Sequence, residues 1–235
     1  FHANIYSVNM TMLERPEINQ LKDKGYTWNQ PFDIVRLFEN KLSEYTGAPY
    51  VTVTDCCTHA IELCLRYEKP TAKLQLPKHT YLSLPMTLNK LNLQFEFVDK
   101  DWTGYYYLAP TKIVDMAARL DKGCYIKNTH SCLSFGHKKV LEILRGGAIL
   151  TDNKQAHEYF QTARYDGRDI NNVPWTKQKE YNIGYHYNLS IEDCARGILL
   201  LDNITNITYN KDLFTDCKSY YPDLSKIKIN YEYNR

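Results

Sequence analysis

Two adjacent lysines, Lys138 and Lys139, follow the apolar run SCLSF (131–135) and precede the pair Gly146-Gly147. Such lysines are ordinarily solvated charges on apolar stems. The alternative is that one of them carries chemistry, since a lysine amine can attack a carbonyl group and bind it covalently. Other residues of the chain must decide between these two interpretations.

Two further side chains stand where strands are expected to end. Asp115 closes the apolar run Lys112–Val114, and a carboxylate in that place is costly unless it has a partner. It either serves a ligand or caps a following helix. Tyr81, soon after Pro77 and Thr80, either covers a flat ring or packs in the core.

A third group opens a helix directly after a strand. The backbone N–H groups of Thr58 and His59, together with the helix dipole, suit a phosphate, although a plain capped turn would look the same. A lysine for a Schiff base, a carboxylate for a pyridine nitrogen, an aromatic cover and a phosphate seat are together what pyridoxal 5'-phosphate requires. Their order on one chain therefore predicts this cofactor.

The elements that must position these residues alternate between strands and helices. Apolar residues at helical spacing from Asp33 to Tyr45, with Gly47 as a stop, predict the first helix. Further helices are expected at 60–67, 81–91 and 190–204, the last with Ser190 as its N-cap. Strands are expected at 50–55, 73–77, 94–99, 112–115, 131–135 and 147–152. This alternation predicts an α/β fold with a mostly parallel central sheet flanked by helices.

Composition excludes several other classes. The chain has 235 residues with a formal net charge of only +2, so no nucleic-acid partner is expected. The seven cysteines are odd in number and lack C-x-x-C spacing, which argues against a disulfide framework or a metal site and favours a cytoplasmic protein. Neither a membrane-spanning run nor a signal-peptide pattern is visible.

The ordered blocks from about residue 33 to 204 resemble the DegT/StrS-type PLP-dependent sugar aminotransferases, which have the fold-type I aspartate-aminotransferase architecture. FENKLSEYTGAPYVTVTDCCTHAIELCL resembles the family's opening helix, first strand and phosphate-binding turn. This implies cofactor contacts by Cys57, Thr58 and His59. LPKHTYLSLPMTLNKLNLQFEFVD resembles the Thr-aromatic block, which implies that Tyr81 stacks on the cofactor ring.

Three other blocks carry the rest of the resemblance. KIVDMAARL implies that Asp115 pairs with the pyridine nitrogen. CLSFGHKKVLEILRGGAILTD resembles the family's Ser-Phe-x-x-x-Lys block, which implies that Ser134 holds the phosphate and that Lys139, not Lys138, is the Schiff-base lysine. GYHYNLSIEDCA implies that Asn188 reaches the cofactor phosphate of a neighbouring subunit in a homodimer with shared active sites.

The chain also departs from the family pattern. Ala118 stands where the family usually has Gln or His near the cofactor, and the segment before Lys112 is shorter than usual. The chain resembles a large domain without most of the C-terminal small domain. We therefore expect an N-terminal arm (1–32), a PLP-binding large domain (33–205) and a peripheral C-terminal segment (206–235).

The resemblance implies transfer of an amino group, from a donor such as glutamate, to a keto-sugar that is nucleotide-linked. Both donor and acceptor would be small molecules. Two alternatives remain open: another PLP-dependent reaction, such as decarboxylation, elimination or dehydration on a non-sugar substrate, and a non-catalytic scaffold with the same fold.

Overall fold

The computed structural model describes residues 15–169, 174–204 and 217–228. Its main element is a five-stranded sheet in the order β1-β7-β6-β5-β4, beside a separate two-stranded sheet of β2 and β3. The strands are β1 (Tyr50–Thr54), β2 (Leu74–Pro77), β3 (Phe95–Val98), β4 (Tyr106–Tyr107), β5 (Ile113–Asp115), β6 (His130–Ser134) and β7 (Gly147–Thr151).

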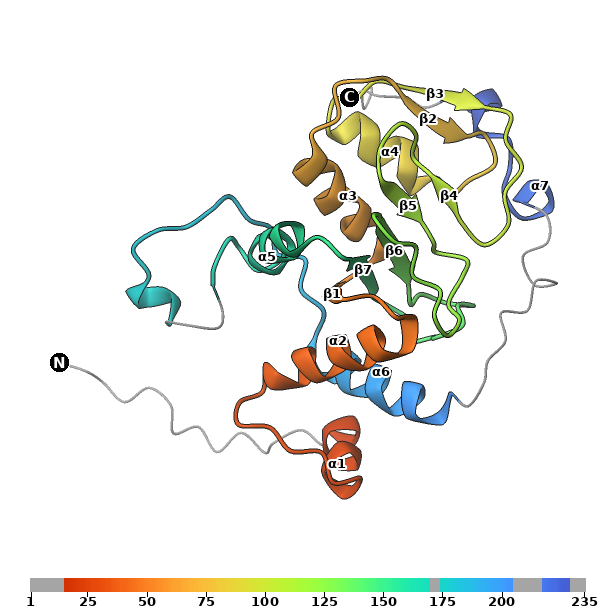
Figure 1. Cartoon of the computed structure of the whole chain (residues 1–235). Helices are drawn as coiled ribbons and strands as arrows, with labels where there is room; N and C mark the ends of the chain where they lie inside the picture. The colour runs from red at the N-terminus through yellow and green to blue at the C-terminus, as the bar shows by residue number, and fades with distance from the viewer. Residues whose placement is uncertain (1–14, 170–173, 205–216, 229–235) are drawn as a thin grey trace, which may run out of the picture.

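Helices lie on both faces of the main sheet, as Figure 1 shows. The α-helices are α1 (Pro16–Asp23), α2 (Asp33–Thr46), α3 (Cys57–Glu68), α4 (Ser83–Lys90), α5 (Lys154–Ala163), α6 (Ile191–Asn203) and α7 (Cys217–Tyr220). Two short 3-10 helices are η1 (Trp175–Lys177) and η3 (Leu224–Lys226). Helices α2 and α6 pack together on one face, with α1 against α6 on the side away from the sheet, and α3 and α5 cover the other face. No helix of the described residues is long and apolar enough to cross a membrane.

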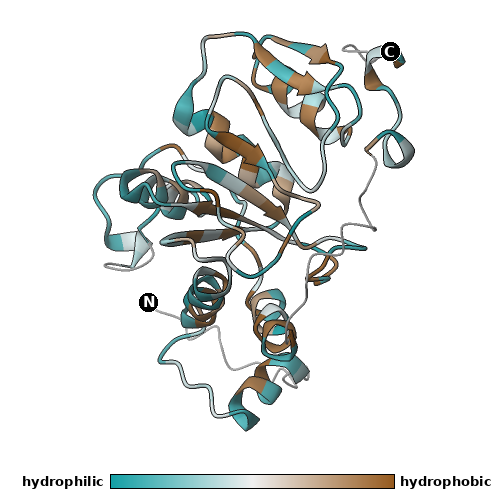
Figure 2. Cartoon of the chain, turned by 45° about the vertical axis from the view of Figure 1, so that its right-hand side comes forward, coloured by the Kyte–Doolittle hydropathy of each residue, from teal (hydrophilic) through white to brown (hydrophobic). Residues whose placement is uncertain are grey.

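The sheet lies between two buried apolar clusters, one on each face. Every residue of β7 is buried, which explains its unbroken apolar sequence GAILT: a strand covered on both faces has no polar side. Figure 2 shows the same arrangement, with apolar residues along the strands and on the inward sides of the helices. Packing on both faces of the sheet holds in place the strands that carry the candidate site.

The predicted α/β class is confirmed, but the expectation of a mostly parallel sheet is wrong. In the main sheet only β5 and β6 pair in parallel, whereas β1–β7, β6–β7 and β4–β5 are antiparallel. A parallel neighbour needs a long crossover, usually a helix. The connections β4–β5 and β6–β7 contain no α-helix or 3-10 helix, and each of them returns the chain in the opposite direction.

Most predicted elements are present, but one helix begins earlier than predicted and two helices were not predicted. Helix α3 begins at Cys57 rather than at residue 60. Helix α2 ends at Thr46, and its C-cap Gly47 has the left-handed conformation (φ 76°), where a glycine is favoured. Ser190 caps α6 as predicted, accepting the N–H of Asp193 at 3.0 Å. The sequence analysis missed α1 and α5, and α1 buries Leu21 in the core beside α6.

Candidate active site

A cavity of about 720 Å³ lies at one edge of the main sheet. Strands β1, β5 and β6 run in the same direction, so their carboxyl ends meet at that edge, which is where α/β folds bind ligands. All but two of the predicted site residues line this cavity: Cys57, Thr58, Tyr81, Asp115, Ser134 and Lys139. The fold therefore brings together side chains that are as far apart in the sequence as Cys57 and Lys139.

The wall after β1 is the N-terminus of α3, a 12-residue helix. Cys56 is its N-cap, and the Cys56 sulfur accepts the backbone N–H of His59 at 3.4 Å. The Thr58 hydroxyl donates to Ser83 Oγ at 2.8 Å, which ties this turn to α4. A helix N-terminus that opens into a cavity attracts an anion through its unpaired N–H groups and its dipole.

Gly147, the first residue of β7, allows this close approach. A Cβ atom there would lie 2.5 Å from the backbone nitrogen of Cys57 and 2.6 Å from the carbonyl carbon of Cys56. Both are backbone atoms, so any other residue would push the α3 N-terminus away from the sheet. The position of the α3 N-terminus against β7 therefore requires glycine at residue 147.

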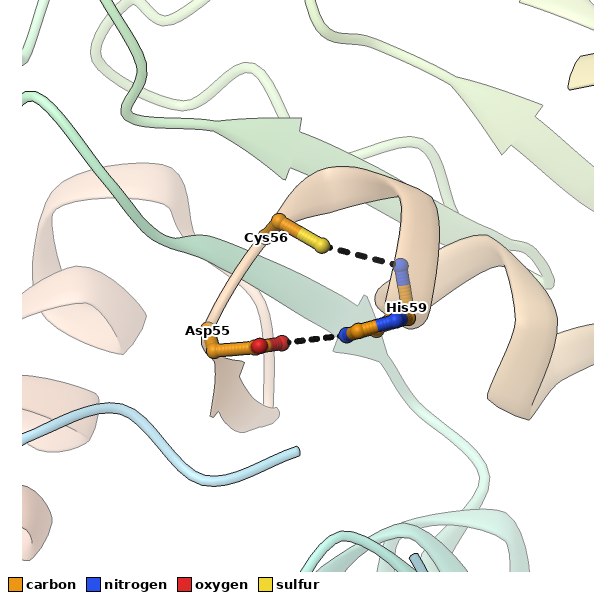
Figure 3. Close-up of side chains that lie close together, drawn as sticks. All are labelled: Asp55, Cys56 and His59. Carbon is orange, nitrogen blue, oxygen red and sulfur yellow. Dashed lines mark hydrogen bonds and ion pairs between the residues drawn. The ribbon is translucent and has the colours of Figure 1, made fainter. Parts of the chain in front are cut away.

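The side chain of His59 does not line the cavity. Its ring stacks on Tyr187 with centroids 3.7 Å apart, and its Nδ1 lies 2.6 Å from Asp55 Oδ1 (Figure 3). Burial lowers the pKa of His59, but the hydrogen bond with Asp55 and the interaction with Cys56 outweigh it and raise the pKa to about 9. His59 is thus a cation behind the helix start, where it anchors Asp55.

Asp55 also binds Arg145, which lines the cavity mouth. The Arg145 guanidinium donates to Asp55 Oδ2 at 2.9 Å and to the Asp55 carbonyl at 3.3 Å. Among the described residues, Asp55, Cys56 and His59 form a group whose ligand atoms lie close enough together for a metal ion. Two cations already neutralise this carboxylate, so the group is better explained as an ion-pair cluster.

Asp115 ends β5 and is only 5% exposed. Its Oδ1 accepts the backbone N–H of Ala117 at 2.9 Å, and its Oδ2 accepts the hydroxyl of Tyr106 at 2.7 Å. Burial raises the pKa of Asp115, against the opposing effects of these hydrogen bonds and of Lys139. The helix-capping alternative is wrong, because residues 116–129, all described, contain no helix.

The two lysines of the β6–β7 connection differ in their surroundings. Lys138 is exposed and has a left-handed backbone (φ 62°), whereas Lys139 is half-buried and lines the cavity. Burial lowers the pKa of Lys139, although the nearby Cys57 and Asp115 oppose this. A lysine with a lowered pKa is more often neutral and so more nucleophilic. Ser134, at the end of β6, accepts the N–H of Gly136 at 3.4 Å.

Aromatic side chains form the outer part of the cavity. Tyr81 is 60% exposed, so its alternative role in core packing is wrong. The segment 217–228 supplies one wall, and the sequence analysis predicted no site residue there. The Tyr221 carbonyl lies 2.8 Å from His79 Nδ1, and the Tyr221 ring stacks on Trp102 with centroids 5.9 Å apart. These contacts hold the segment against the loops that follow β2 and β3.

Asn188 and Ala118 lie away from the cavity lining. Asn188 precedes α6, and its side-chain oxygen is buried without a hydrogen-bond partner among the described residues. Ala118 is buried just after β5, and its neighbour Ala117 lines the cavity in its place. The sequence analysis missed Arg145 and Tyr221 in the lining, and also Tyr106 behind Asp115, whose only sequence signal is its place in the run Tyr105–Tyr107.

Solved structures share this fold at low sequence identity. The chain is similar to AtS13 from Actinomadura melliaura (TM-score 0.63, 17% identity, 79% of this chain and 63% of that chain). It is also similar to 3-amino-5-hydroxybenzoic acid (AHBA) synthase (TM-score 0.64, 17% identity, 81% and 61%). A third similar structure is GDP-4-keto-6-deoxymannose-3-dehydratase (TM-score 0.60, 15% identity, 80% and 64%). The chain therefore spans less than two thirds of the length of these structures.

The sequence comparisons complete the assignment. No curated protein matches the chain. The model of the DegT/DnrJ/EryC1/StrS aminotransferase family matches residues 10–118 and 122–229, which include every residue that lines the cavity. The chain belongs to the DegT/DnrJ/EryC1/StrS aminotransferase family.

Proposed function

We propose that this protein is a PLP-dependent aminotransferase that moves an amino group, from an amino acid such as glutamate, to the keto group of a nucleotide-linked sugar. The observation that carries the proposal is one cavity that holds the Lys139 amine, the Asp115 carboxylate and the N-terminus of α3. Family membership supports the same reaction class.

The residues present fit pyridoxal 5'-phosphate. The cavity has the volume of a small-molecule site, and its lining includes the N-terminus of α3, Thr58 and Ser134, which suit a phosphate. Asp115 would accept the N–H of the cofactor ring, and Tyr81 would cover the ring face. Lys139 is the lining amine whose pKa is lowered by burial, which suits attachment to an aldehyde.

When bound, the cofactor supplies a ring that draws electrons from the carbon beside the substrate nitrogen. The chain's own residues then act on protons. Lys139, as a neutral amine, would take the proton from that carbon and return it as an acid on the other side of the nitrogen. Asp115 keeps a proton on the ring nitrogen by hydrogen bonding as a carboxylate.

A dehydration of a keto-sugar on the same cofactor is the second candidate. One of the similar solved structures is a dehydratase, which uses the same fold for that reaction class. Both reactions begin with removal of a proton by an amine or imidazole, so the residues of the cavity serve either of them. The two candidates differ at the sugar: transamination places the amino group on the keto carbon, whereas dehydration breaks a C–O bond and releases water.

Spectroscopy of the purified protein tests the proposal. The wild type should be yellow, and borohydride should trap the cofactor covalently on Lys139, as located by peptide mass spectrometry. Glutamate should then convert the bound cofactor to its amino form and bleach the visible band. A protein that never takes up added PLP would overturn both candidates, and one that takes it up but never reacts with an amino donor would exclude transamination.

A cytoplasmic homodimer with shared active sites completes the proposal. Asn188 lies outside the cavity lining, and the described residues give its buried side-chain oxygen no hydrogen-bond partner, which supports a role across a subunit interface. All seven cysteines are free, as suits a reducing compartment. Light scattering gives the mass in solution, and a fully active monomer would exclude the shared site.

A further inference from the structure

A chain of buried hydrogen bonds stands behind Asp115. The Tyr106 hydroxyl donates to Asp115 Oδ2 at 2.7 Å and lies 2.6 Å from the Thr80 hydroxyl. A phenol has one proton to donate, so Thr80 must be the donor in the second bond. Tyr106 is 2% exposed and Thr80 is equally buried, so water does not compete for these groups.

The fold fixes the position of Tyr106. Strand β4 pairs with β5 in a register that sets Tyr106 directly opposite Asp115. The ring of Tyr106 packs on Trp102, with centroids 4.9 Å apart, and the Trp102 indole N–H donates to the His79 carbonyl at 2.8 Å. The hydroxyl therefore reaches Asp115 from a ring that cannot turn away.

Other groups also surround the Asp115 carboxylate. Ala117 donates one backbone N–H to Oδ1, whereas Lys139 and Cys57 face the carboxylate within the cavity and Tyr221 faces it from the segment 217–228. Ala118 stands where the resembling family usually has a polar Gln or His, and its methyl group has no hydrogen bond to give. The Tyr106 hydroxyl is a neutral side-chain donor to this carboxylate, and it approaches from β4, behind the cavity wall.

We propose that Tyr106, oriented by Thr80, is a positioning residue that holds the Asp115 carboxylate ionised and facing the cavity. The inference rests on the proposed function only for the identity of the ring that Asp115 meets. Removal of the hydroxyl leaves a buried oxygen of Asp115 without its donor, which favours the protonated acid.

The first experiment measures Asp115 itself, by NMR titration of its carboxyl carbon in the full chain freed of cofactor. The signal is assigned by its loss in Asp115→Asn. Tyr106→Phe should lower the acid dissociation constant of Asp115 about tenfold, the effect of one hydrogen bond to a charged group. The matched control is Tyr107→Phe, since the next residue of a strand points to the opposite face, and it should leave that constant unchanged.

The second experiment adds the cofactor. The dissociation constant of PLP is measured by absorbance. It should be about tenfold larger in Tyr106→Phe than in the wild type, and unchanged in Tyr107→Phe. Thr80→Val, which keeps the shape of the side chain, should shift both measurements in the same direction by a smaller factor. It also decides the matter if Tyr106→Phe does not fold.

The outcomes separate the two proposals. If the wild type binds no PLP, the proposed function fails, while the NMR titration still decides the role of Tyr106. If folded Tyr106→Phe and Thr80→Val both leave the dissociation constant of Asp115 unchanged, the positioning role is wrong, whatever the cofactor does. A merely structural role for Tyr106 would lower the stability of the variant without moving that constant.

Discussion

Two buried carboxylates of this protein have opposite surroundings. Glu39, 7% exposed, meets the guanidinium of Arg164, which is 2% exposed and also donates to the Val53 carbonyl at 2.6 Å. Val53 and Gln161 give Glu39 further hydrogen bonds, at 2.9 Å and 3.1 Å. Asp115 instead receives two neutral hydrogen bonds and faces a cavity.

The difference separates a structural charge from a functional one. Glu39 joins α2, β1 and the end of α5 through partners that are all part of the fold, so its charge is neutralised before any ligand arrives. Burial raises the pKa of Asp115 because the fold gives it less compensation. Such a group is costly to the folded state, and it is kept where a ligand makes use of it.

The largest effect on activity is expected for Lys139→Ala. Loss of the amine removes both the attachment point and the proton carrier, so turnover should fall by at least about a thousandfold. Turnover of the keto acceptor and the visible absorbance band are the measurements. Lys138→Ala is the matched control, since Lys138 is exposed and should leave both unchanged.

The unfolding free energy of Lys139→Ala shows whether the loss of turnover comes from missing chemistry or from unfolding. Lys139→Ala should change it by less than about 1 kcal/mol, as for a side chain that lines a cavity and supports no core packing. A variant that keeps its turnover, or that loses it only by unfolding, would show that Lys139 belongs with Glu39 among the structural charges.

Arg164→Met should show the opposite pattern. Breaking this buried pair leaves Glu39 without its cation and should lower the unfolding free energy by about 3–5 kcal/mol, as measured by urea denaturation. Cofactor affinity per folded molecule should stay at the wild-type value. The control is Arg36→Met on α2, which breaks a surface pair with Asp33 and should cost at most about 1 kcal/mol.

Equal losses of unfolding free energy in Arg164→Met and Arg36→Met would contradict this prediction. They would mean that the buried Glu39–Arg164 pair stabilises the fold no more than a surface pair does. The double variant Glu39→Leu with Arg164→Met adds a further check, because replacing both charges by apolar groups should restore much of the loss.

Local motifs explain how much of the site was predictable from the sequence. Lys139, Ser134, Asp115 and Thr58 each follow a strand within one continuous block, so a pattern of neighbours places them at the sheet edge. The α/β class follows from the same alternation. Short sequence motifs therefore predict which side chains meet at the site, and six of the eight predicted site residues line the cavity.

Long-range pairing explains what the sequence could not reveal. Tyr106 reaches Asp115 through the register of β4, a two-residue strand too short to show any period. Segment 217–228 joins the cavity through contacts with Lys78 and His79, far away in the sequence. The direction of β7 depends on a connection without a helix, and α1 buries only Ile18 and Leu21, too few to mark a helix.

Two glycines test the comparison through sterics. In Gly147→Ala the new Cβ meets the backbone of Cys57, so the start of α3 must shift, at a cost of about 1–3 kcal/mol. In Gly197→Ala the new Cβ meets the Phe38 ring at 2.5 Å, in the cluster on the other face of the sheet, at a similar cost. PLP affinity should fall in the first variant alone, because only there does the anion seat move.

Denaturation and PLP titration are run on both glycine variants under the same conditions. Equal weakening of PLP binding in the two would show that general loosening, not the position of the α3 N-terminus, controls the affinity. Unchanged PLP binding in Gly147→Ala would show that the close approach of β7 to the α3 N-terminus is not needed for binding the cofactor.

The smallest effect is a pH dependence of stability behind the cavity. The pKa of His59 is raised to about 9 in the folded protein by Asp55 and Cys56 against the effect of burial, from an ordinary value of 6.5. Its contribution is therefore fully present below about pH 6.5 and is lost as the pH rises through about 9. Because the ring is partly exposed, we expect a loss of only about 1 kcal/mol over this window, as measured by urea denaturation at each pH. His59→Gln should remove that slope, and Asp55→Asn should reduce it, whereas a slope that persists in His59→Gln would assign the titration to another group.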